Sequence, residues 1–290
     1  MKSLKIIVLA KQVPDTRNVG KDAMKADGTV NRAALEAIFN PEDLNALEQA
    51  LSIKDMVPGS EVSLLTMGPG RAAEIIREGF YRGADDGVLL TDRKFAGSDT
   101  LATSYAIATA IGKMEYDIVV AGRQAIDGDT AQVGPQVAEK LNIPQVTYVE
   151  NIEKIDAKSM TIRRRLDNGF EIVKTPFPVL LTVHSSAPDC RPRIAKNVMK
   201  YKHARTLTEL QDASEDYTRM FQDRPYLKIR EMGVDDIGAD NEALGLSGSP
   251  TKVKKIENVV FKAKEAKVIS ADDKEIEDLI VELIENHTIG

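Results

Sequence analysis

A strand, a polar turn and a helix start follow one another within residues 116–144, and this stretch is the best suited to bind a phosphate. Residues 118–121 form an apolar run long enough for a buried strand, which Gly122 ends. In an open parallel sheet, the turn after a strand lies at the carboxyl edge, where nucleotides bind. The exposed amides and the dipole of the following helix start favour a phosphate.

The helix start itself leaves two interpretations open. Asp129 and Thr130 are good N-cap residues, so we expect a helix from about Thr130 to Leu141. The turn contains no strict Gly-x-Gly-x-x-Gly or Walker pattern. Spacing alone therefore allows either a phosphate site or an ordinary turn between a strand and a helix.

A second set of polar side chains begins another predicted helix. Ser98 or Asp99 can cap a helix over residues 100–113, which places Thr100 and Thr103 in its first turn. Hydroxyl groups at a helix start can hydrogen-bond a ligand. Capping and solvation explain the same residues without a ligand, so the pattern does not decide between the two.

Buried apolar strands alternate with helices through residues 1–184, which we expect to form a nucleotide-binding domain. Asn40 followed by Pro41 and two acidic residues is a clear helix start, and a turn at residues 26–29 predicts a small surface hairpin. The alternation predicts an α/β fold, a Rossmann-like doubly wound parallel sheet with helices on both faces. The expected strands lie at residues 5–10, 61–67, 88–90, 118–121, 146–149 and, as the last, 179–183; the expected helices lie at 41–56, 72–82, 100–113 and 130–141.

The pattern changes after about residue 150. Residues 158–176 alternate charged and apolar side chains around an Asp-Asn-Gly turn, which predicts a β-hairpin insertion with one exposed face. Residues 185–256 contain few apolar clusters, so we expect an extended arm that packs poorly on its own domain and docks on a partner. A solvated charged face is the other explanation of its basic residues. Residues 257–290 form a C-terminal extension with an amphipathic helix expected over 271–286.

Composition excludes several classes of function. A net charge of −6 and a pI near 5.3 argue against nucleic acid as the main partner. The single cysteine, Cys190, excludes an internal disulfide and fits a reducing cytoplasm. No apolar run approaches the roughly 18 residues of a membrane span, so we expect no direct membrane insertion. Scattered histidines predict no metal site, and the sequence lacks the nucleophile patterns of hydrolases.

Several short motifs resemble the β subunit of electron transfer flavoprotein, the family that includes the nitrogen-fixation-linked FixA proteins. Each motif is weak alone, but together they extend over nearly the whole chain in the family's order. They are Val8-Leu9-Ala10-Lys11-Gln12-Val13-Pro14-Asp15, Asn40-Pro41, Thr66-Met67-Gly68-Pro69, Arg82-Gly83-Ala84-Asp85 and Ala121-Gly122-Arg123-Gln124-Ala125-Ile126-Asp127-Gly128-Asp129.

The resemblance implies a fold of the adenine-nucleotide α-hydrolase type and a heterodimer with an α subunit that carries FAD. It also implies an adenine-nucleotide site in this chain. The positions that match the family's site are Leu9, Asn40, Pro41, Glu42, Asp43, Met67, Gly122, Arg123, Gln124, Ala125, Ile126, Asp127, Gly128, Asp129, Thr130, Ala131, Gln132 and Val133. Here Gly122 is expected to let the backbone approach the ligand closely, and Asp127 and Asp129 to act as turn and cap acids.

The resemblance leaves the nucleotide open between two branches of the family. In simple electron carriers it is AMP with a structural role, and in electron-bifurcating members it is a second FAD that accepts hydride from NADH. Residues 13–16, 95–105 and 248–251 look like the bifurcating branch. In that branch, Asp99, Thr100 and Thr103 would lie at the polar edge of the flavin.

The expected function is therefore that of a β subunit that passes electrons from NADH through its own FAD. The electrons would go to the α-subunit FAD and on to an acceptor dehydrogenase or quinone reductase. One alternative is a simple electron carrier with structural AMP, and another is a non-redox regulatory module that binds an adenine nucleotide. A yellow solution after co-expression with the α subunit would favour a redox role.

Overall fold

The computed structural model describes residues 2–15, 36–211, 218–251, 268–285 and 289. The chain divides into two compact units, residues 1–254 and 255–290. The surface hairpin expected at residues 26–29 lies outside the described residues. Among the helices of the described residues, none has the length and apolar character needed to cross a membrane.

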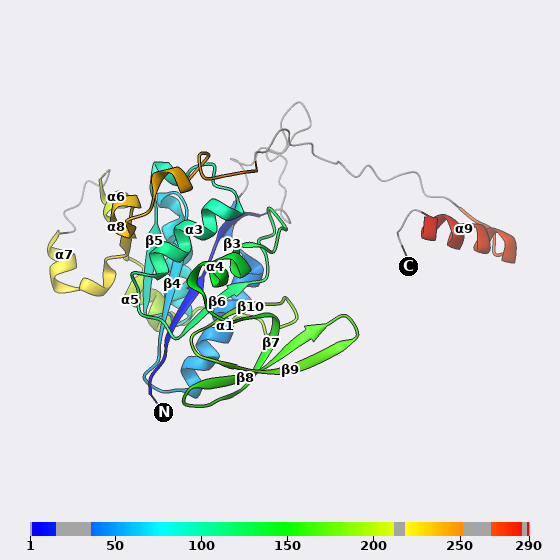
Figure 1. Ribbon diagram of the computed structural model, residues 1–290, viewed down its shortest axis with the longest axis horizontal. Helices are drawn as coiled ribbons and strands as arrows, with labels where there is room; N and C mark the ends of the chain where they lie inside the picture. Colours follow the sequence, from blue (N-terminus) through cyan, green and yellow to red (C-terminus); the bar gives the residue numbers. More distant parts are fainter. Residues whose placement is uncertain (1, 16–35, 212–217, 252–267, 286–288, 290) are drawn as a thin grey trace. The chain divides into compact units, whose positions relative to one another are not determined.

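One nine-stranded sheet forms the centre of the first unit, in the order β11-β5-β4-β1-β6-β10-β7-β8-β9 (Figure 1). The strands from β11 to β7 are parallel, and β8 and β9 continue the sheet antiparallel. The strands are β1 (Lys5–Leu9), β4 (Glu61–Met67), β5 (Asp86–Leu90), β6 (Ile118–Gly122), β7 (Gln145–Ile155), β8 (Ser159–Leu166), β9 (Gly169–Pro176), β10 (Val179–Val183) and β11 (Arg230–Met232). Strands β2 (Gln12–Pro14) and β3 (Ala37–Phe39) form a separate antiparallel pair.

Helices cover both faces of the parallel part, as expected for a doubly wound fold (Figure 1). Alternate side chains of β1 point to opposite faces, so Val8 is buried in one apolar cluster with Leu47, and Ile7 in the other with Ile107. The principal helices are α1 (Pro41–Met56), α2 (Ala73–Arg82) and α5 (Ala195–Tyr201) at the first cluster, and α3 (Thr100–Ile111), α4 (Val133–Leu141) and α8 (Val234–Ile237) at the second. Shorter helices are α6 (Leu207–Leu210), α7 (Thr218–Asp223), η2 (Gly70–Ala72), η3 (Arg93–Phe95), η4 (Pro225–Leu227) and η5 (Asn241–Ala243).

The strand order reverses beside β1. From β1 the chain continues to β4 and β5 on one side, and it then returns to β6 and β10 on the other. In doubly wound folds, ligands bind beyond the carboxyl ends of the strands at such a reversal. The fold therefore predicts a ligand site among the loops that follow β1, β4, β5 and β6.

The predicted hairpin is formed by β8 and β9. It pairs with β7, which is longer than the strand expected there. Among the described residues, β10 is the last fully buried strand, and it lies between β6 and β7. A later strand that the sequence did not predict, β11, pairs with β5 at the edge of the sheet. β11 has only three residues on a sheet edge, Arg-Glu-Met, which carry no buried-strand signal.

The expectation that residues 185–256 pack poorly on their own domain was wrong for the described part. Tyr201, Leu227 and Ile229 are buried in the cluster that contains α1, and Ile237 and Leu244 are buried in the cluster that contains α3. These short apolar segments cannot fold alone, but they complete the two faces of the sheet. Docking of this part on a partner stays a prediction.

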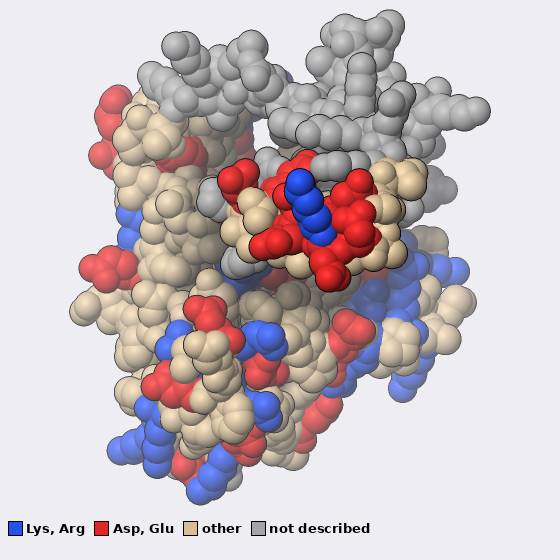
Figure 2. All heavy atoms as spheres, turned by 90° about the vertical axis from the view of Figure 1, so that its right-hand side faces the viewer, with Lys and Arg blue, Asp and Glu red and all other residues tan. Residues whose placement is uncertain are grey.

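The described part of the second unit contains the helix that was expected over residues 271–286. It is α9 (Asp273–Glu285), and none of its side chains is buried. Ile276, Ile280 and Ile284 are 40–51% exposed along this helix. Figure 2 shows its acidic side chains crowded around one lysine; the charged residues of the helix and its start are Asp272, Asp273, Lys274, Glu275, Glu277, Asp278, Glu282 and Glu285.

Candidate functional site

A pocket of about 670 Å³ lies at the carboxyl edge of the sheet, at the ends of β1, β4, β5 and β6. Most of the expected site residues line it: Leu9, Asp43, Met67, Asp99, Thr100, Thr103, Gly122, Arg123, Gln124, Ala125, Gly128, Asp129, Thr130, Ala131, Gln132 and Val133. The exceptions are Asn40, Pro41, Glu42, Ile126 and Asp127. Binding of a nucleotide by this set stays a prediction.

The start of α1 holds the turn after β6, which we call the first wall (residues 122–134). Asn40 occupies the N-cap position as expected, but its side chain does not cap the helix. Its amide donates to the carbonyl of Gln124 at 2.9 Å and its oxygen accepts from the amide of Ile126 at 3.1 Å. Glu42 accepts from the amide of Gln124 at 2.9 Å and pairs with Arg123 at 3.0 Å. Asn40 and Glu42 therefore position the wall from behind.

Asp43 joins the ends of the two strands beside the strand-order reversal. Its carboxylate accepts from the amide of Lys11, after β1, at 2.8 Å and from the amide of Gly122, at the end of β6, at 3.1 Å. Burial raises the pKa of Asp43 to about 7, against the opposing effect of the hydrogen bonds from Lys11, Asn40 and Gly122. A single buried side chain thus fixes the distance between two pocket loops.

Gly122 does allow a close approach, but the neighbour is α1. A Cβ at Gly122 would lie 2.8 Å from the backbone nitrogen of Asp43 and 2.8 Å from the carbonyl carbon of Glu42. Close approach of Gly122 to a ligand stays a prediction, and the structure shows a close approach to the first turn of α1. The glycine is needed because the end of β6 packs directly on the first turn of α1.

The helix at the end of the first wall, α4, starts three residues later than expected. α4 begins at Val133 because Asp129 and Ala131 have left-handed φ angles of 49° and 52°, which a helix cannot include. Asp129 is therefore not a cap; it accepts from the side chain of Gln124 at 2.9 Å. Asp127 pairs instead with Lys11 at 2.7 Å.

The amides of Val133 and Gly134 make no hydrogen bond within the described residues, and Pro135 follows them. Gln132 occupies the N-cap without a side-chain hydrogen bond to the helix. Both free amides belong to pocket-lining residues at the positive end of α4. This is a local arrangement that suits an anion such as a phosphate.

The loop before α3 and its first turn form the second wall (residues 95–103). Asp99 caps α3 through Oδ1, which accepts from the amides of Leu101 and Ala102. Its Oδ2 accepts from the amide and the hydroxyl of Thr251 at 3.1 and 2.7 Å. Although burial opposes ionisation of Asp99, the hydrogen bonds from Thr251 and from the amide of Ala102 hold its pKa below the usual value. Its carboxylate has no strong acceptor site left for a ligand.

Hydroxyl groups of the second wall remain available for a ligand. Thr103 lines the pocket, and its hydroxyl makes no hydrogen bond to any described residue. Thr100 donates to the side-chain oxygen of Gln132 at 2.9 Å, so the two walls meet across this bond. Residues 95–105 and 248–251, which resembled one branch of the family, thus lie together at this wall.

Sequence reasoning did not assign several lining residues to the site. Thr91, Asp92 and Arg93 follow β5, and Phe95 and Ile107 complete the apolar side of the pocket. The signal for the first three was available, because they directly follow a buried parallel strand. Ile107 lies one turn further along α3 than Thr103, on the same face of the helix.

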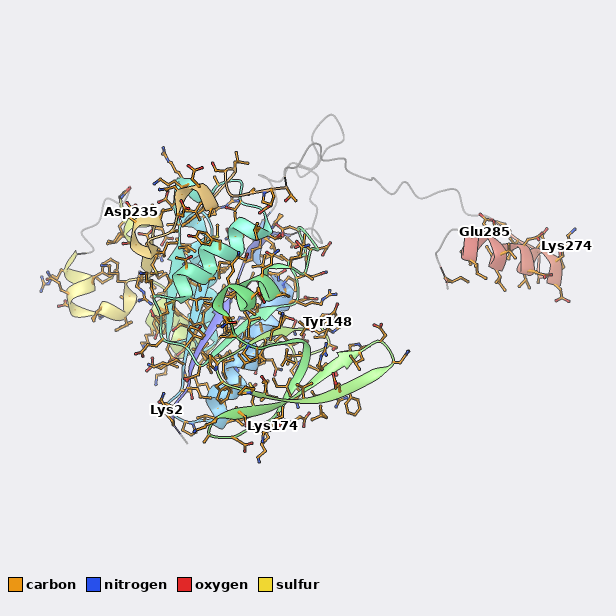
Figure 3. All side chains as sticks on the ribbon, in the orientation of Figure 1. Lys2, Tyr148, Lys174, Asp235, Lys274 and Glu285 are labelled. Carbon is orange, nitrogen blue, oxygen red and sulfur yellow. The ribbon has the colours of Figure 1, made fainter. Side chains whose placement is uncertain are left out.

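A second polar cluster lies at the same edge, outside the pocket. The ring of Tyr148, labelled in Figure 3, lies 5.8 Å from the guanidinium of Arg123 and stacks on His184 with 5.7 Å between ring centroids. Tyr148 has a φ of 56° at an irregularity in the pairing of β7 with β10. Burial and the charge of Arg123 lower the pKa of His184. Arg123 thus belongs to both groups of residues.

Comparison with known proteins agrees with the motifs in this pocket. The family described as the electron transfer flavoprotein domain matches residues 27–208. The electron transfer flavoprotein subunit beta of Clostridium acetobutylicum is 44% identical over 287 residues, 99% of this chain and 100% of that protein. The caffeyl-CoA reductase-Etf complex subunit CarD of Acetobacterium woodii is 44% identical over 251 residues, 86% of each chain. Protein FixA of Sinorhizobium fredii is 36% identical over 286 residues, 96% of this chain and 92% of that protein.

These relatives are 36–44% identical over 86–99% of this chain, and the family match alone covers residues 27–208. The chain therefore belongs to the electron transfer flavoprotein family.

Proposed function

We propose that the chain is the β subunit of a heterodimeric electron transfer flavoprotein and binds FAD in the pocket between the two walls. In this proposal electrons pass from NADH through this FAD to the FAD of an α subunit, and on to an acceptor dehydrogenase or quinone reductase. The chain would act in the cytoplasm. The name of the Acetobacterium woodii relative, a subunit of a caffeyl-CoA reductase-Etf complex, supports this class of partner.

One observation carries the proposal: residues of both walls line the same pocket. The first wall alone, with its free amides at α4, suits the phosphate of any adenine nucleotide. The second wall adds the hydroxyls of Thr100 and Thr103 and the apolar surfaces of Phe95 and Ile107. FAD contains a second phosphate and a second ring system in addition to the parts that it shares with AMP, so it offers groups for both walls to contact.

The residues present fit such a ligand. The carboxylates of Asp43 and Asp99 line the pocket but accept hydrogen bonds within the protein, so their repulsion of phosphates is reduced. The amides of Val133 and Gly134 are unpaired donors among the described residues. The volume of about 670 Å³ lies well within the range of roughly 300–1,000 Å³ typical of small-molecule and cofactor sites.

A bound flavin would supply hydride and one-electron chemistry, and the chain would supply orientation and electrostatics. The free amides of α4 would hold the phosphates, and the dipole of α3 would stabilise negative charge that develops on the ring. Thr103 would donate a hydrogen bond to the polar edge of the ring. Ile107 and Phe95 would exclude water from the apolar side.

The test uses the heterodimer, purified anaerobically with its α subunit. Bound nucleotides are extracted and identified, and the protein is titrated with NADH. We expect two flavins per heterodimer and bleaching of both. Thr100→Val with Thr103→Val should weaken FAD binding by roughly tenfold or more, because a hydrogen bond to a charged group contributes about 1.5–3 kcal/mol.

Thr109→Val is the matched control, because this residue lies on α3 outside the pocket and donates to the carbonyl of Tyr105. One flavin with tightly bound AMP and no bleaching by NADH would instead make the chain a simple electron carrier. A heterodimer without flavin in this chain or its partner would support the non-redox regulatory module.

A further inference from the structure

The second wall is held in place by a segment far away in the sequence. Residues 244–251, which we call the strap, lie against residues 94–99. The amide of Gly245 donates to the hydroxyl of Ser98 at 3.2 Å, and the amide of Asp99 donates to the hydroxyl of Ser249 at 2.8 Å. Thr251 donates its amide and its hydroxyl to Asp99. The strap therefore contacts the wall at successive positions.

The strap and the wall pack closely at two glycines. A Cβ at Gly97 would lie 2.7 Å from the side chain of Leu246, and one at Gly245 would collide with the carbonyl of Lys94. Ser249 is 3% exposed, and its hydroxyl donates to the carbonyl of Gly245 at 2.6 Å while it accepts from Asp99. Its hydrogen-bonding capacity is used within this contact, which makes it a rigid support.

The strap also determines how Asp99 caps α3. Asp99 uses one carboxylate oxygen for the helix and the other for Thr251. Without Thr251, the carboxylate is free to rotate, and the cap on Leu101 and Ala102 weakens. Since Thr100 and Thr103 lie in the turn that this cap defines, their direction into the pocket depends on the strap.

We infer that Ser249 and Thr251 are positioning residues for the nucleotide pocket: they set the second wall through Asp99 without touching the ligand. The inference rests on the proposed function only in that the pocket binds a nucleotide. Beyond that function, the inference states that the affinity for the nucleotide depends on the hydroxyls of Ser249 and Thr251, which do not line the pocket.

The test measures the dissociation constants of FAD and of AMP, each added to heterodimer from which nucleotide has been removed. Thr251→Val should weaken binding of whichever nucleotide the pocket holds by about tenfold. Thr251→Ser keeps the hydroxyl and should restore wild-type affinity. Ser249→Ala should act like Thr251→Val, and Thr109→Val should leave affinity unchanged.

Hydrogen–deuterium exchange supplies a readout that needs no ligand. Amides within residues 96–105 should exchange faster in Thr251→Val than in Thr251→Ser, while α4 stays unchanged. Equal affinity and exchange in Thr251→Val, Thr251→Ser and wild type would overturn the inference. Tight AMP and weak FAD binding by wild type would contradict the proposed FAD site, yet the strap would still be tested through AMP.

Discussion

The two walls of the pocket are supported in different ways. The first wall is held by the start of α1, whose Asn40, Glu42 and Asp43 are almost completely buried and lie about 80 residues earlier in the chain. The second wall is held by the strap, about 150 residues later, through the buried hydroxyl of Ser249 and the exposed hydroxyl of Thr251. The first support belongs to the core of the sheet, so its loss should unfold the domain. The second should be separable from folding.

The largest loss of stability is expected from a substitution that disrupts the first wall. Gly122→Val places a branched side chain against the backbone of Asp43 and Glu42, so the start of α1 must move away from β6. Overpacking and the lost Asp43 hydrogen bond together should lower the free energy of unfolding by about 4 kcal/mol. Urea denaturation measures this. Gly128→Val is the control, since a Cβ at Gly128 meets nothing within 4 Å, and equal losses in both variants would contradict the explanation.

The next effect tests whether the late segments belong to the same folding unit. Ile237 is 1% exposed and packs in the cluster that contains α3. Ile237→Ala should cost about 3 kcal/mol of unfolding free energy in a single transition. Ile280→Ala on α9, where the side chain is 45% exposed, should cost almost nothing. An unchanged Ile237→Ala protein would return residues 185–251 to the status of an independent arm.

Asp43→Asn should sharpen the comparison through its pH dependence. Asparagine offers one acceptor for two amide donors, which should cost about 1–3 kcal/mol under acidic conditions. Because the folded pKa of Asp43 is raised to about 7 from the usual 3.8, this group stabilises the fold below pH 3.8, and that stability is lost as the pH rises to about 7. The advantage of wild type over the variant should therefore shrink over this range. Urea denaturation across the range measures it, and a growing advantage would show that the carboxylate is buried as an anion without cost.

The smallest expected effect concerns the bond that joins the walls. Thr100→Val removes the hydrogen bond to Gln132, which is exposed to solvent, so the unfolding free energy should fall by only about 0.5–1 kcal/mol. Thr100→Ser should recover this loss in a thermal melt. A loss as large as that of Ile237→Ala would mean that the walls depend on each other for folding.

The sequence predicted the elements whose buried residues form one continuous apolar stretch. β4 and β10 have the expected bounds because each is a mostly apolar stretch that adjoins a residue which breaks regular structure, Gly68 after β4 and Pro178 before β10. The start of α4 was wrong because Asp129 is a good cap by type but has a left-handed backbone. β11 and the burial of Leu227 and Ile237 were missed because short apolar segments show no periodic pattern in the sequence before they pack on the sheet.

The same division holds for the site. Gly122 and Asp43 were expected in the pocket because they match the family's site, and Thr103 because residues 95–105 resemble one branch of the family; all three line the pocket. The partners that fix them were not readable, because Asn40 reaches Gln124 and Asp99 meets Thr251 only after the sheet has folded. Contacts between segments so distant in sequence leave no local signal.

The bond between Asp99 and Thr251 also determines when the pocket can be completed during synthesis. A ribosome releases the chain from its N-terminus, so the residues of the first wall and the helix that supports it emerge before the strap does. Thr251 follows Asp99 by 152 residues, so the second wall receives its support much later in synthesis than the first wall. The pocket is therefore complete only once the strap has left the ribosome.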